Sequence, residues 1–183
     1  MILLNTQDLI AKSASGDRKA QQQLYKRLNA PMMGVSVRYM KDQQDAEDVL
    51  LEGFYKIFKN LKKFKYESEH GFFGWAKRSM VNEALMKLRK NKEIQLLAIN
   101  EDLDKEMDVS PLMKLQTSDL LKMLSSIPVG YRTVFNMYEV EGYSHQEISQ
   151  QLGVSVGTSK SQLFKAKKML REMLDAKNEG YGS

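Results

Sequence analysis

The sequence contains no cysteine among its 183 residues, which excludes disulfide bonds, thiolate metal ligands and cysteine nucleophiles. Its two histidines, His70 and His145, are too few to predict a metal site. No glycine-rich phosphate loop and no repeated pairing of acids with histidine points to catalysis or to a cofactor. The sequence therefore predicts a protein that is not an enzyme and that uses neither a metal nor a cofactor.

Long apolar runs are also missing from the sequence. In its first segment, MILLNTQDLIAKSASGD, only a short apolar run precedes polar residues, too short for a signal peptide or a membrane-spanning helix. We therefore expect no membrane insertion and a cytoplasmic location. The formal net charge of +5 and the pI of about 9.2 suit a polyanionic partner without proving one.

Proline and glycine are sparse, at 3 and 11 residues, and no segment alternates apolar and polar residues as a half-buried strand does. Nearly every segment has helical periodicity instead, so the predicted fold is all-α. Over residues 92–117 this periodicity loosens, acidic residues gather and Pro111 interrupts. We therefore predict two small helical domains, residues 1–91 and 118–183, joined by a flexible acidic linker.

Capping residues and helix breakers predict where the helices of the first domain begin and end. A first helix is expected around residues 7–14 and should end at Ser15 and Gly16. Asp17 can cap a second helix, and Pro31 can open a third.

The clearest motif is SHQEISQQLGVSVGTSKSQLFKAKKMLREML, residues 144–174. Ser144 and Glu147 have the spacing of a capping box, so a helix should begin there and stop at Gly153. Ser155 can then accept amide protons at the start of a second, longer helix. The segment is predicted to form a helix-turn-helix, which makes the second domain a candidate for binding duplex DNA.

One stripe of the second helix is predicted to pack inward: Leu163, Ala166, Leu170 and Leu174. The remaining residues predict a recognition helix in a DNA major groove: Lys160, Ser161, Gln162, Phe164, Lys165 and Lys168. The lysines would contact phosphates and base edges, Ser161 and Gln162 would form hydrogen bonds, and Phe164 would touch a thymine methyl group. A solvated basic face explains the charge by itself, but not its combination with the capping box and the glycine turn.

A second amphipathic segment, DAEDVLLEGFYKIFKNL, spans residues 45–61 with acids at its beginning and lysines at its end. This order matches the helix dipole, so an ordinary amphipathic helix accounts for the charges. A protein-docking surface accounts for them equally well, and the residues alone leave both alternatives open.

The next segment, KKFKYESEHGFFGWAKRSMVNEALMKLRK, is a basic, aromatic-rich loop that leads into a helix from about Gly71 to Lys90. Its inward stripe is predicted to contain Phe73, Met80, Ala84 and Leu88, with Trp75, Arg78 and Asn82 on the opposite side. Aromatics interleaved with cations suit single-stranded nucleic acid, whose bases stack and whose phosphates attract cations. A core position is equally open for Trp75, so Arg78 and Asn82 are the better candidates.

Three segments, in this order, resemble the extracytoplasmic-function (ECF) sigma factors of bacterial RNA polymerase, in the sigma-70 family: DAEDVLLEGFYKIFKNLKKF, GFFGWAKRSMVNEALMKLRK and IPVGYRTVFNMYEVEGYSHQEISQQLGVSVGTSKSQLFKAKKMLREML. The resemblance covers nearly the whole chain. It implies a protein that binds core RNA polymerase and directs promoter recognition, melting of the downstream (minus-ten) element and transcription initiation, without covalent chemistry of its own.

The resemblance also assigns roles to residues. Contact with core polymerase, through its β′ clamp helices and β subunit, is implied for Asp45, Glu47, Asp48, Glu52 and Lys56. Capture of a single-stranded minus-ten base is implied for Phe64, His70, Trp75, Arg78 and Asn82. Major-groove reading of the upstream (minus-thirty-five) element is implied for Lys160, Ser161, Phe164 and Lys165. Promoter DNA and an anti-sigma factor are therefore expected partners.

The sequence departs from the family pattern at three positions. Ser159 stands where an aliphatic residue is common, Val156 where an acid is frequent, and Gln162 where an arginine is frequent. A stand-alone helix-turn-helix regulator, which binds an operator without polymerase, is the alternative function. It would explain residues 144–174 but would give the aromatic, basic helix and the linker no role.

Overall fold

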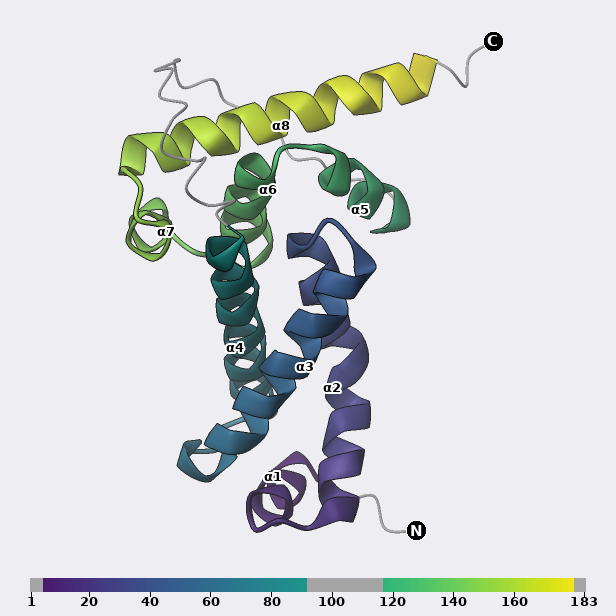
Figure 1. Ribbon diagram of the computed structural model, residues 1–183, viewed down its shortest axis with the longest axis vertical. Helices are drawn as coiled ribbons and strands as arrows, with labels where there is room; N and C mark the ends of the chain where they lie inside the picture. The colour runs from purple at the N-terminus through teal and green to yellow at the C-terminus, as the bar shows by residue number, and fades with distance from the viewer. Residues whose placement is uncertain (1–4, 92–116, 180–183) are drawn as a thin grey trace. The chain divides into compact units, whose positions relative to one another are not determined.

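A computed structural model describes residues 5–91 and 117–179 of the chain, with side chains for 5–91 and 121–176. Its elements are α1 (Thr6–Ala14), α2 (Arg18–Tyr39), α3 (Gln43–Asn60), the 3-10 turn η1 (Leu61–Lys63), α4 (Glu69–Lys90), α5 (Thr117–Ser126), α6 (Val129–Phe135), the π-helical turn η3 (Asn136–Val140), α7 (His145–Leu152) and α8 (Val156–Glu179) (Figure 1). The described residues contain no strand, so the all-α prediction is confirmed.

The chain divides into two compact units, Met1–Lys87 and Leu88–Ser183. The predicted domain limits place the first boundary at residue 91, and they stay a prediction. Apart from Thr117, which begins α5, the predicted linker lies outside the described residues.

In the first unit, α1 packs against α2 and α2 against α3, with η1 returning to α1. Asp17 caps α2 as predicted, because its carboxylate accepts hydrogen bonds from the amides of Lys19 at 2.8 Å and Ala20 at 3.0 Å. The bond from the Ala20 amide is the main cause that lowers the pKa of Asp17 below its ordinary value. The cap thus fixes where α2 begins.

The prediction that Pro31 opens a third helix is wrong, because Pro31 lies inside the continuous helix α2. A proline in a helix interior loses one backbone hydrogen bond and costs roughly 3 kcal/mol. Here Leu28, Met32 and Val35 are buried on both sides of it, so one apolar stripe runs through the proline. Packing of this stripe outweighs the local penalty, while Pro31 itself faces solvent.

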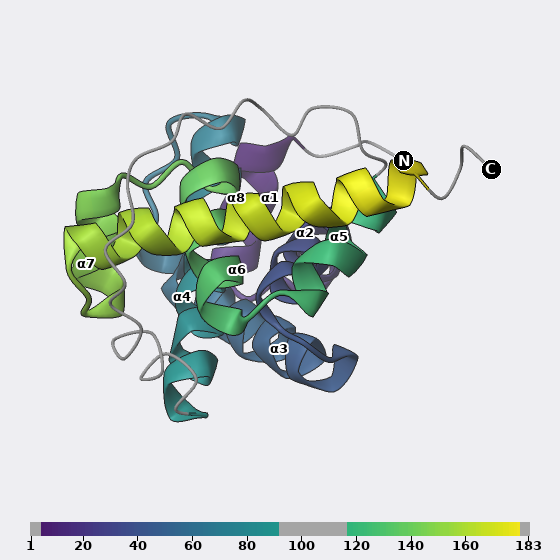
Figure 2. The same cartoon turned by 90° about the horizontal axis from the view of Figure 1, so that it is seen from above.

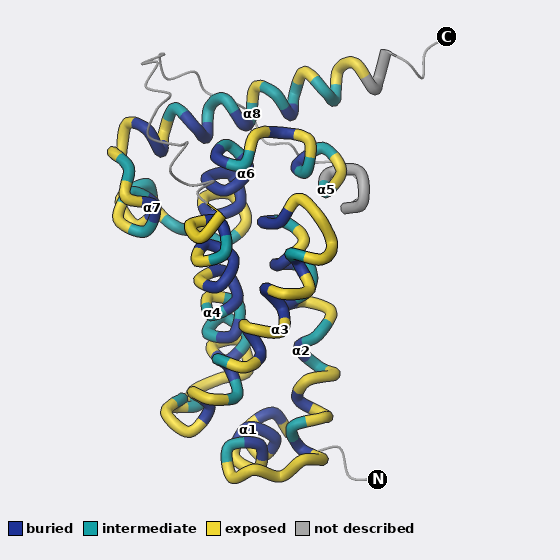
Figure 3. Tube along the Cα trace, viewed as in Figure 1, coloured by how far each residue is buried: buried dark blue, intermediate teal, exposed yellow. Residues whose placement is uncertain are grey.

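The buried face of α4 also differs from the prediction. Phe72 is fully buried and Phe73 only partly, so Phe72 takes the core position that was predicted for Phe73. The rest of the buried face contains the predicted residues Met80, Ala84 and Leu88. In Figure 3, dark blue stretches recur along α4 between intermediate and exposed ones.

Helices α3 and α4 approach closely at Gly53, which is buried. A methyl group added at Gly53 would lie 2.6 Å from Cε of Met80 and still closer to its Sδ. Met80 is itself fully buried, so it has little space into which to move.

Replacement of Gly53 therefore gives a first prediction. We expect Gly53→Ala to lower the free energy of unfolding by about 1 kcal/mol, because overpacking of about 1–3 kcal/mol exceeds the gain in helix propensity. Gly74 in α4 is the matched control, since nothing lies within 4 Å of an added Cβ there. Gly74→Ala should instead raise stability by up to about 1 kcal/mol. Urea unfolding followed by circular dichroism measures both, and equal stabilisation by the two changes would contradict the close approach.

In the second unit, the long helix α8 packs on α6, on α7 and on α5. Figure 2 shows α7 near the N-terminal end of α8 and α5 towards its other end. The turn η3 continues α6 in π-helical form and also contacts α7. Tyr138 and Val140 of this turn are exposed.

The turn between α7 and α8 forms as the sequence predicts. The Oγ of Ser144 accepts from the Glu147 amide at 3.2 Å, and the Glu147 carboxylate accepts from the Ser144 amide at 2.8 Å, which completes the capping box. Gly153 ends α7 in the left-handed conformation, with φ 69°. Ser155 then accepts from the Thr158 amide at 2.9 Å at the beginning of α8. The helix-turn-helix is therefore present.

Candidate functional site

The first candidate surface is the outer side of α8. Lys160 and Lys168 are exposed, and Ser161, Phe164 and Lys165 are partly exposed. These five predicted readers share one side of the helix, opposite the buried residues Leu163, Ala166 and Leu170. The Ser161 hydroxyl donates to the Thr158 carbonyl at 3.1 Å, so it is left as an acceptor. A cationic helix face with one aromatic side chain can lie along a DNA groove.

Gln162 does not belong to this surface, which corrects the sequence prediction. Its side chain is only 2% exposed, and within the described part of the chain its Oε1 has no hydrogen-bond partner. At 100° per residue, Gln162 lies about 40° from Ala166 and about 60° from Ser159 around the helix, which places it on the inward stripe. A more careful helical wheel therefore finds this from the sequence. Leu174, predicted to be inward, is half-buried.

Ser159, which departs from the family pattern, is fully buried at the interface between α7 and α8. Its Oγ lies 2.9 Å from Nδ1 of His145, and the imidazole stacks on the ring of Tyr138 with centroids 4.4 Å apart. Burial lowers the pKa of His145 below its ordinary value, and the charges of Lys160 and Lys167 lower it further.

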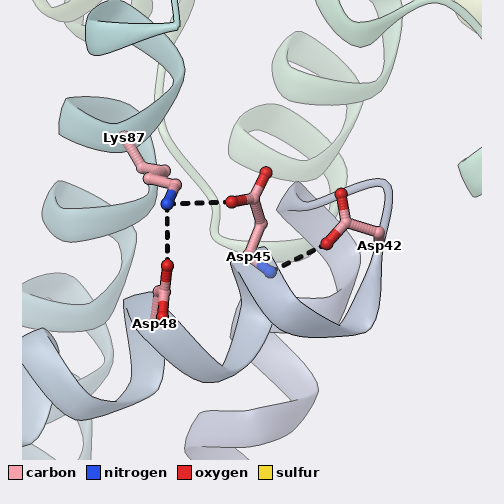
Figure 4. Close-up of polar contacts among 4 residues, drawn as sticks. All are labelled: Asp42, Asp45, Asp48 and Lys87. Atoms are coloured by element: carbon pink, nitrogen blue, oxygen red, sulfur yellow. Dashed lines mark hydrogen bonds and ion pairs between the residues drawn. The ribbon is translucent and has the colours of Figure 1, made fainter.

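The second candidate surface is the outer face of α3, whose first two turns carry several carboxylates. Nζ of Lys87, from α4, lies 2.8 Å from a carboxylate oxygen of Asp45 and 2.9 Å from one of Asp48 (Figure 4). These two hydrogen bonds raise the pKa of Lys87, and the bond to Asp45 has the larger effect. Asp42 caps the helix by accepting from the Asp45 amide at 2.8 Å. The predicted polymerase contacts Asp45 and Asp48 are thus held in fixed positions.

The other predicted residues of this surface have different surroundings. Glu47 is exposed and accepts from Nε2 of Gln43 at 2.8 Å. Glu52 is exposed. Lys56 is partly buried, with its Nζ 2.6 Å from Oε1 of the buried Glu83 in α4. Lys56 therefore joins α3 to α4 as well as facing solvent.

Two apolar residues of this face were missed by the sequence analysis. Leu51 is 64% exposed and Tyr55 is 60% exposed, one helical turn apart on α3. Lys59 lies over the Tyr55 ring, 5.5 Å from its centroid. Both residues lie outside the buried apolar stripe of α3, which contains Val49 and Phe54. A helical wheel of the sequence could have identified them as apolar residues on the exposed side.

The third candidate surface combines the loop after η1 with α4. The Phe64 ring packs against Trp75, with centroids 4.8 Å apart, and against Phe72 at 5.4 Å. Phe64 and Trp75 are partly exposed, so each ring is supported on one side and open to solvent elsewhere. Trp75 is therefore neither a fully buried core residue nor a fully exposed one, and its role in binding nucleic acid stays a prediction.

Exposed polar groups surround this aromatic cluster. Arg78 lies three residues after Trp75 and Asn82 four residues after Arg78, which puts all three on one side of α4. Both are exposed, as is His70 at the start of the helix. The loop also presents exposed lysines: Lys62, Lys63 and Lys65. Partly exposed rings beside cations form a surface that can stack a base and neutralise phosphates.

No group of three or more acidic or histidine side chains able to hold a metal ion occurs in residues 5–91 and 117–179. None of the helices in these ranges is sufficiently long and apolar to cross a membrane.

Comparison with known families gives two matches on the chain. The family model for sigma-70 region 2 matches residues 24–94, and the model for sigma-70, region 4 matches residues 117–170. The first range includes α3 and α4, and the second includes α7, the turn after it and α8 up to residue 170.

Curated relatives share a quarter to a third of their residues with this chain. The ECF RNA polymerase sigma-E factor of Haemophilus influenzae is 28% identical over 185 residues, covering 93% of this chain and 96% of that protein. The ECF RNA polymerase sigma factor SigE of Mycolicibacterium smegmatis is 29% identical over 170 residues, covering 88% of this chain. The chain spans only 65% of the length of this second relative.

Among solved structures, the sigma factor RpoE of Bartonella quintana, in complex with the anti-sigma factor NepR, has a similar fold. It matches with a TM-score of 0.52 and 19% identity, over 84% of this chain and 96% of that one.

Proposed function

The chain belongs to the ECF sigma factors of the sigma-70 family, and on that premise we propose that it binds core RNA polymerase and directs it to promoters. The observation that carries this proposal is the order of two matched regions, each with a surface suited to its task. The 24–94 region presents an apolar and charged helix face beside an aromatic, basic surface, and the 117–170 region presents a cationic recognition helix.

Polymerase docking is assigned to the outer face of α3. Leu51 and Tyr55 supply apolar area, which a partner can bury. Asp45 and Asp48 are held by Lys87. Glu47 and Glu52 add negative charge near the apolar pair, which favours a partner helix that carries cations. We expect the apolar pair to contribute most of the affinity and the acids most of the orientation.

Capture of the melted minus-ten strand is assigned to the surface of Phe64, His70, Trp75, Arg78 and Asn82. Flipping a base out of a duplex costs a few kcal/mol, and stacking on an aromatic ring returns roughly 1–3 kcal/mol per base. Asn82 can read a base edge, and Arg78 can neutralise a phosphate. Chemistry is left to the polymerase, so the chain itself needs no catalytic residue.

Reading of the minus-thirty-five element is assigned to the outer side of α8, without Gln162. Lys160, Lys165 and Lys168 would contact phosphates or base edges, and Phe164 would meet a thymine methyl group. We also propose an anti-sigma partner for this chain, as NepR is for the sigma factor RpoE of Bartonella quintana. The site of action would be the cytoplasm, where polymerase and promoter are found.

Reconstitution tests the proposed function. The chain, mixed with core polymerase, should co-elute with it on gel filtration and support run-off transcription from promoters mapped by sequencing the RNA that it initiates. A stand-alone regulator would instead bind duplex DNA without polymerase at about 10⁻⁸–10⁻¹¹ M. Failure to co-elute, together with tight binding to DNA alone, would favour that alternative.

A second prediction concerns Lys165. Lys165→Ala should reduce run-off transcription at a promoter that depends on its minus-thirty-five element, by about 1–3 kcal/mol of binding free energy if Lys165 reads a base. Lys122→Ala, which changes an exposed lysine of α5, is the control and should leave transcription unchanged. If transcription by the Lys165→Ala protein equals that of the control, Lys165 is not a reader.

A further inference from the structure

We propose that His145 is a positioning residue for DNA recognition: its hydrogen bond to Ser159, covered by the ring of Tyr138, holds α8 in a fixed orientation on α7. This inference rests on the proposed function of α8 as the recognition helix. It concerns no contact with DNA, because Ser159 is fully buried and His145 only partly exposed.

The geometry places the three side chains on three different elements. His145 is the first residue of α7, Ser159 lies in the first turns of α8, and Tyr138 belongs to the π-helical turn η3. The Nδ1–Oγ distance is 2.9 Å and the two rings are nearly parallel, at 21°. This hydrogen bond therefore connects α7 to the recognition helix α8, and the ring of Tyr138 limits the movement of the imidazole.

Ser159 explains why this hydrogen bond matters in this chain. An aliphatic residue at this position would hold α7 and α8 together by apolar contact, whereas a buried serine hydroxyl needs a hydrogen-bond partner. His145 provides that partner. Position 160 follows directly, so a shift of Ser159 would also move Lys160 on the DNA-facing side.

The same contact makes the orientation depend on pH. A neutral imidazole can accept or donate at Nδ1, but an imidazolium can only donate, so protonation removes one of the two arrangements. The charged or titratable groups near His145 are Lys160 and Lys167 on α8, Tyr138 and Glu139 on η3, and Glu147 on α7 itself. Glu139 is paired with Lys167 at 2.6 Å, and Glu147 is engaged in the capping box. The surroundings therefore favour the neutral ring.

The direction of the pH effect follows from the lowered pKa of His145. In the unfolded chain a histidine takes up its proton near pH 6.5, whereas the folded protein resists protonation until a lower pH. Between these two values the unfolded state binds more protons, so the stability of this domain falls as the pH falls. Above about pH 6.5 the contribution of His145 is complete.

Run-off transcription by the reconstituted holoenzyme tests the proposal. The template is a promoter mapped from the RNA that this holoenzyme initiates, beside a copy whose minus-thirty-five element is replaced. The ratio of transcription from the two templates isolates recognition by α8. At about pH 7.5, His145→Ala should lower this ratio roughly 2- to 12-fold, the equivalent of one hydrogen bond. His145→Asn, whose amide can occupy the position of Nδ1 without ever carrying a charge, should preserve it.

As the pH is lowered from about 7.5 to below the ordinary histidine value of about 6.5, the wild-type ratio should fall once His145 becomes protonated, and the ratio for His145→Asn should stay level. If the His145→Asn ratio follows the wild-type curve, or if His145→Ala leaves the ratio unchanged at high pH, the proposal is overturned. Thermal unfolding of each variant at high pH checks that it is folded. Lys165→Ala distinguishes failure of this inference from failure of the proposed function. If Lys165→Ala lowers the ratio and His145→Ala does not, only this inference fails, whereas an unchanged ratio for Lys165→Ala contradicts the proposed role of α8 as the recognition helix.

Discussion

Replacement of Leu51 and Tyr55 by glutamate is expected to abolish binding to core polymerase while the protein stays folded. The two side chains are the most exposed large apolar residues of the described chain, at 64% and 60%. A central apolar residue of an interface typically contributes about 2–4 kcal/mol, so each change should weaken binding roughly 30- to 1,000-fold. Fluorescence anisotropy of the labelled chain, titrated with core enzyme, measures the loss.

A matched control separates this effect from added negative charge. Gln23→Glu introduces the same carboxylate at an exposed position of α2 and should leave the affinity unchanged. Both glutamate variants of α3 should unfold within about 0.5 kcal/mol of the wild type, since neither side chain belongs to the core. Folded variants that bind core polymerase normally would place the docking surface elsewhere.

The helices and their ends were largely predictable because they depend on local chemistry. Asp17, Ser144 and Gly153 act over three or four residues, and the sequence displays these residues together with their partners. The buried stripe of α8 follows in the same way from its spacing. Gln162 could have been placed on that stripe by the same geometry, and was misplaced because its polarity was weighed above its position.

Other features depend on contacts between segments that are distant in the sequence, which periodicity does not contain. Pro31 was predicted to begin a helix because local propensity favours this, but the apolar stripe of α2 continues through it. The pairing of Lys87 with Asp45 joins residues 42 positions apart, and the bond between His145 and Ser159 crosses a turn. The sequence identified these side chains as polar, and only the packing of α3 on α4 and of α7 on α8 made them partners.

Loss of Arg78 and Asn82 together is expected to block promoter opening while leaving promoter binding nearly unchanged. Both are exposed on α4 beside Trp75, whose ring is supported by Phe64 and Phe72, so alanine at these positions should leave the fold intact. Flipping a base out of the duplex costs a few kcal/mol. If Arg78 and Asn82 hold the extruded strand, their loss removes part of the binding free energy that offsets this cost. Opening should therefore slow by one to two orders of magnitude, roughly 1–3 kcal/mol.

A fluorescent base analogue in the non-template minus-ten strand reports opening, and a gel shift of the holoenzyme reports binding. On a template that is mismatched across the minus-ten element, the strands are already separated, so the duplex no longer opposes capture. The defect of the double variant should then shrink, because the step that needed this free energy has been removed. A defect of equal size on both templates would mean that Arg78 and Asn82 act in binding the polymerase or the duplex rather than in holding the single strand.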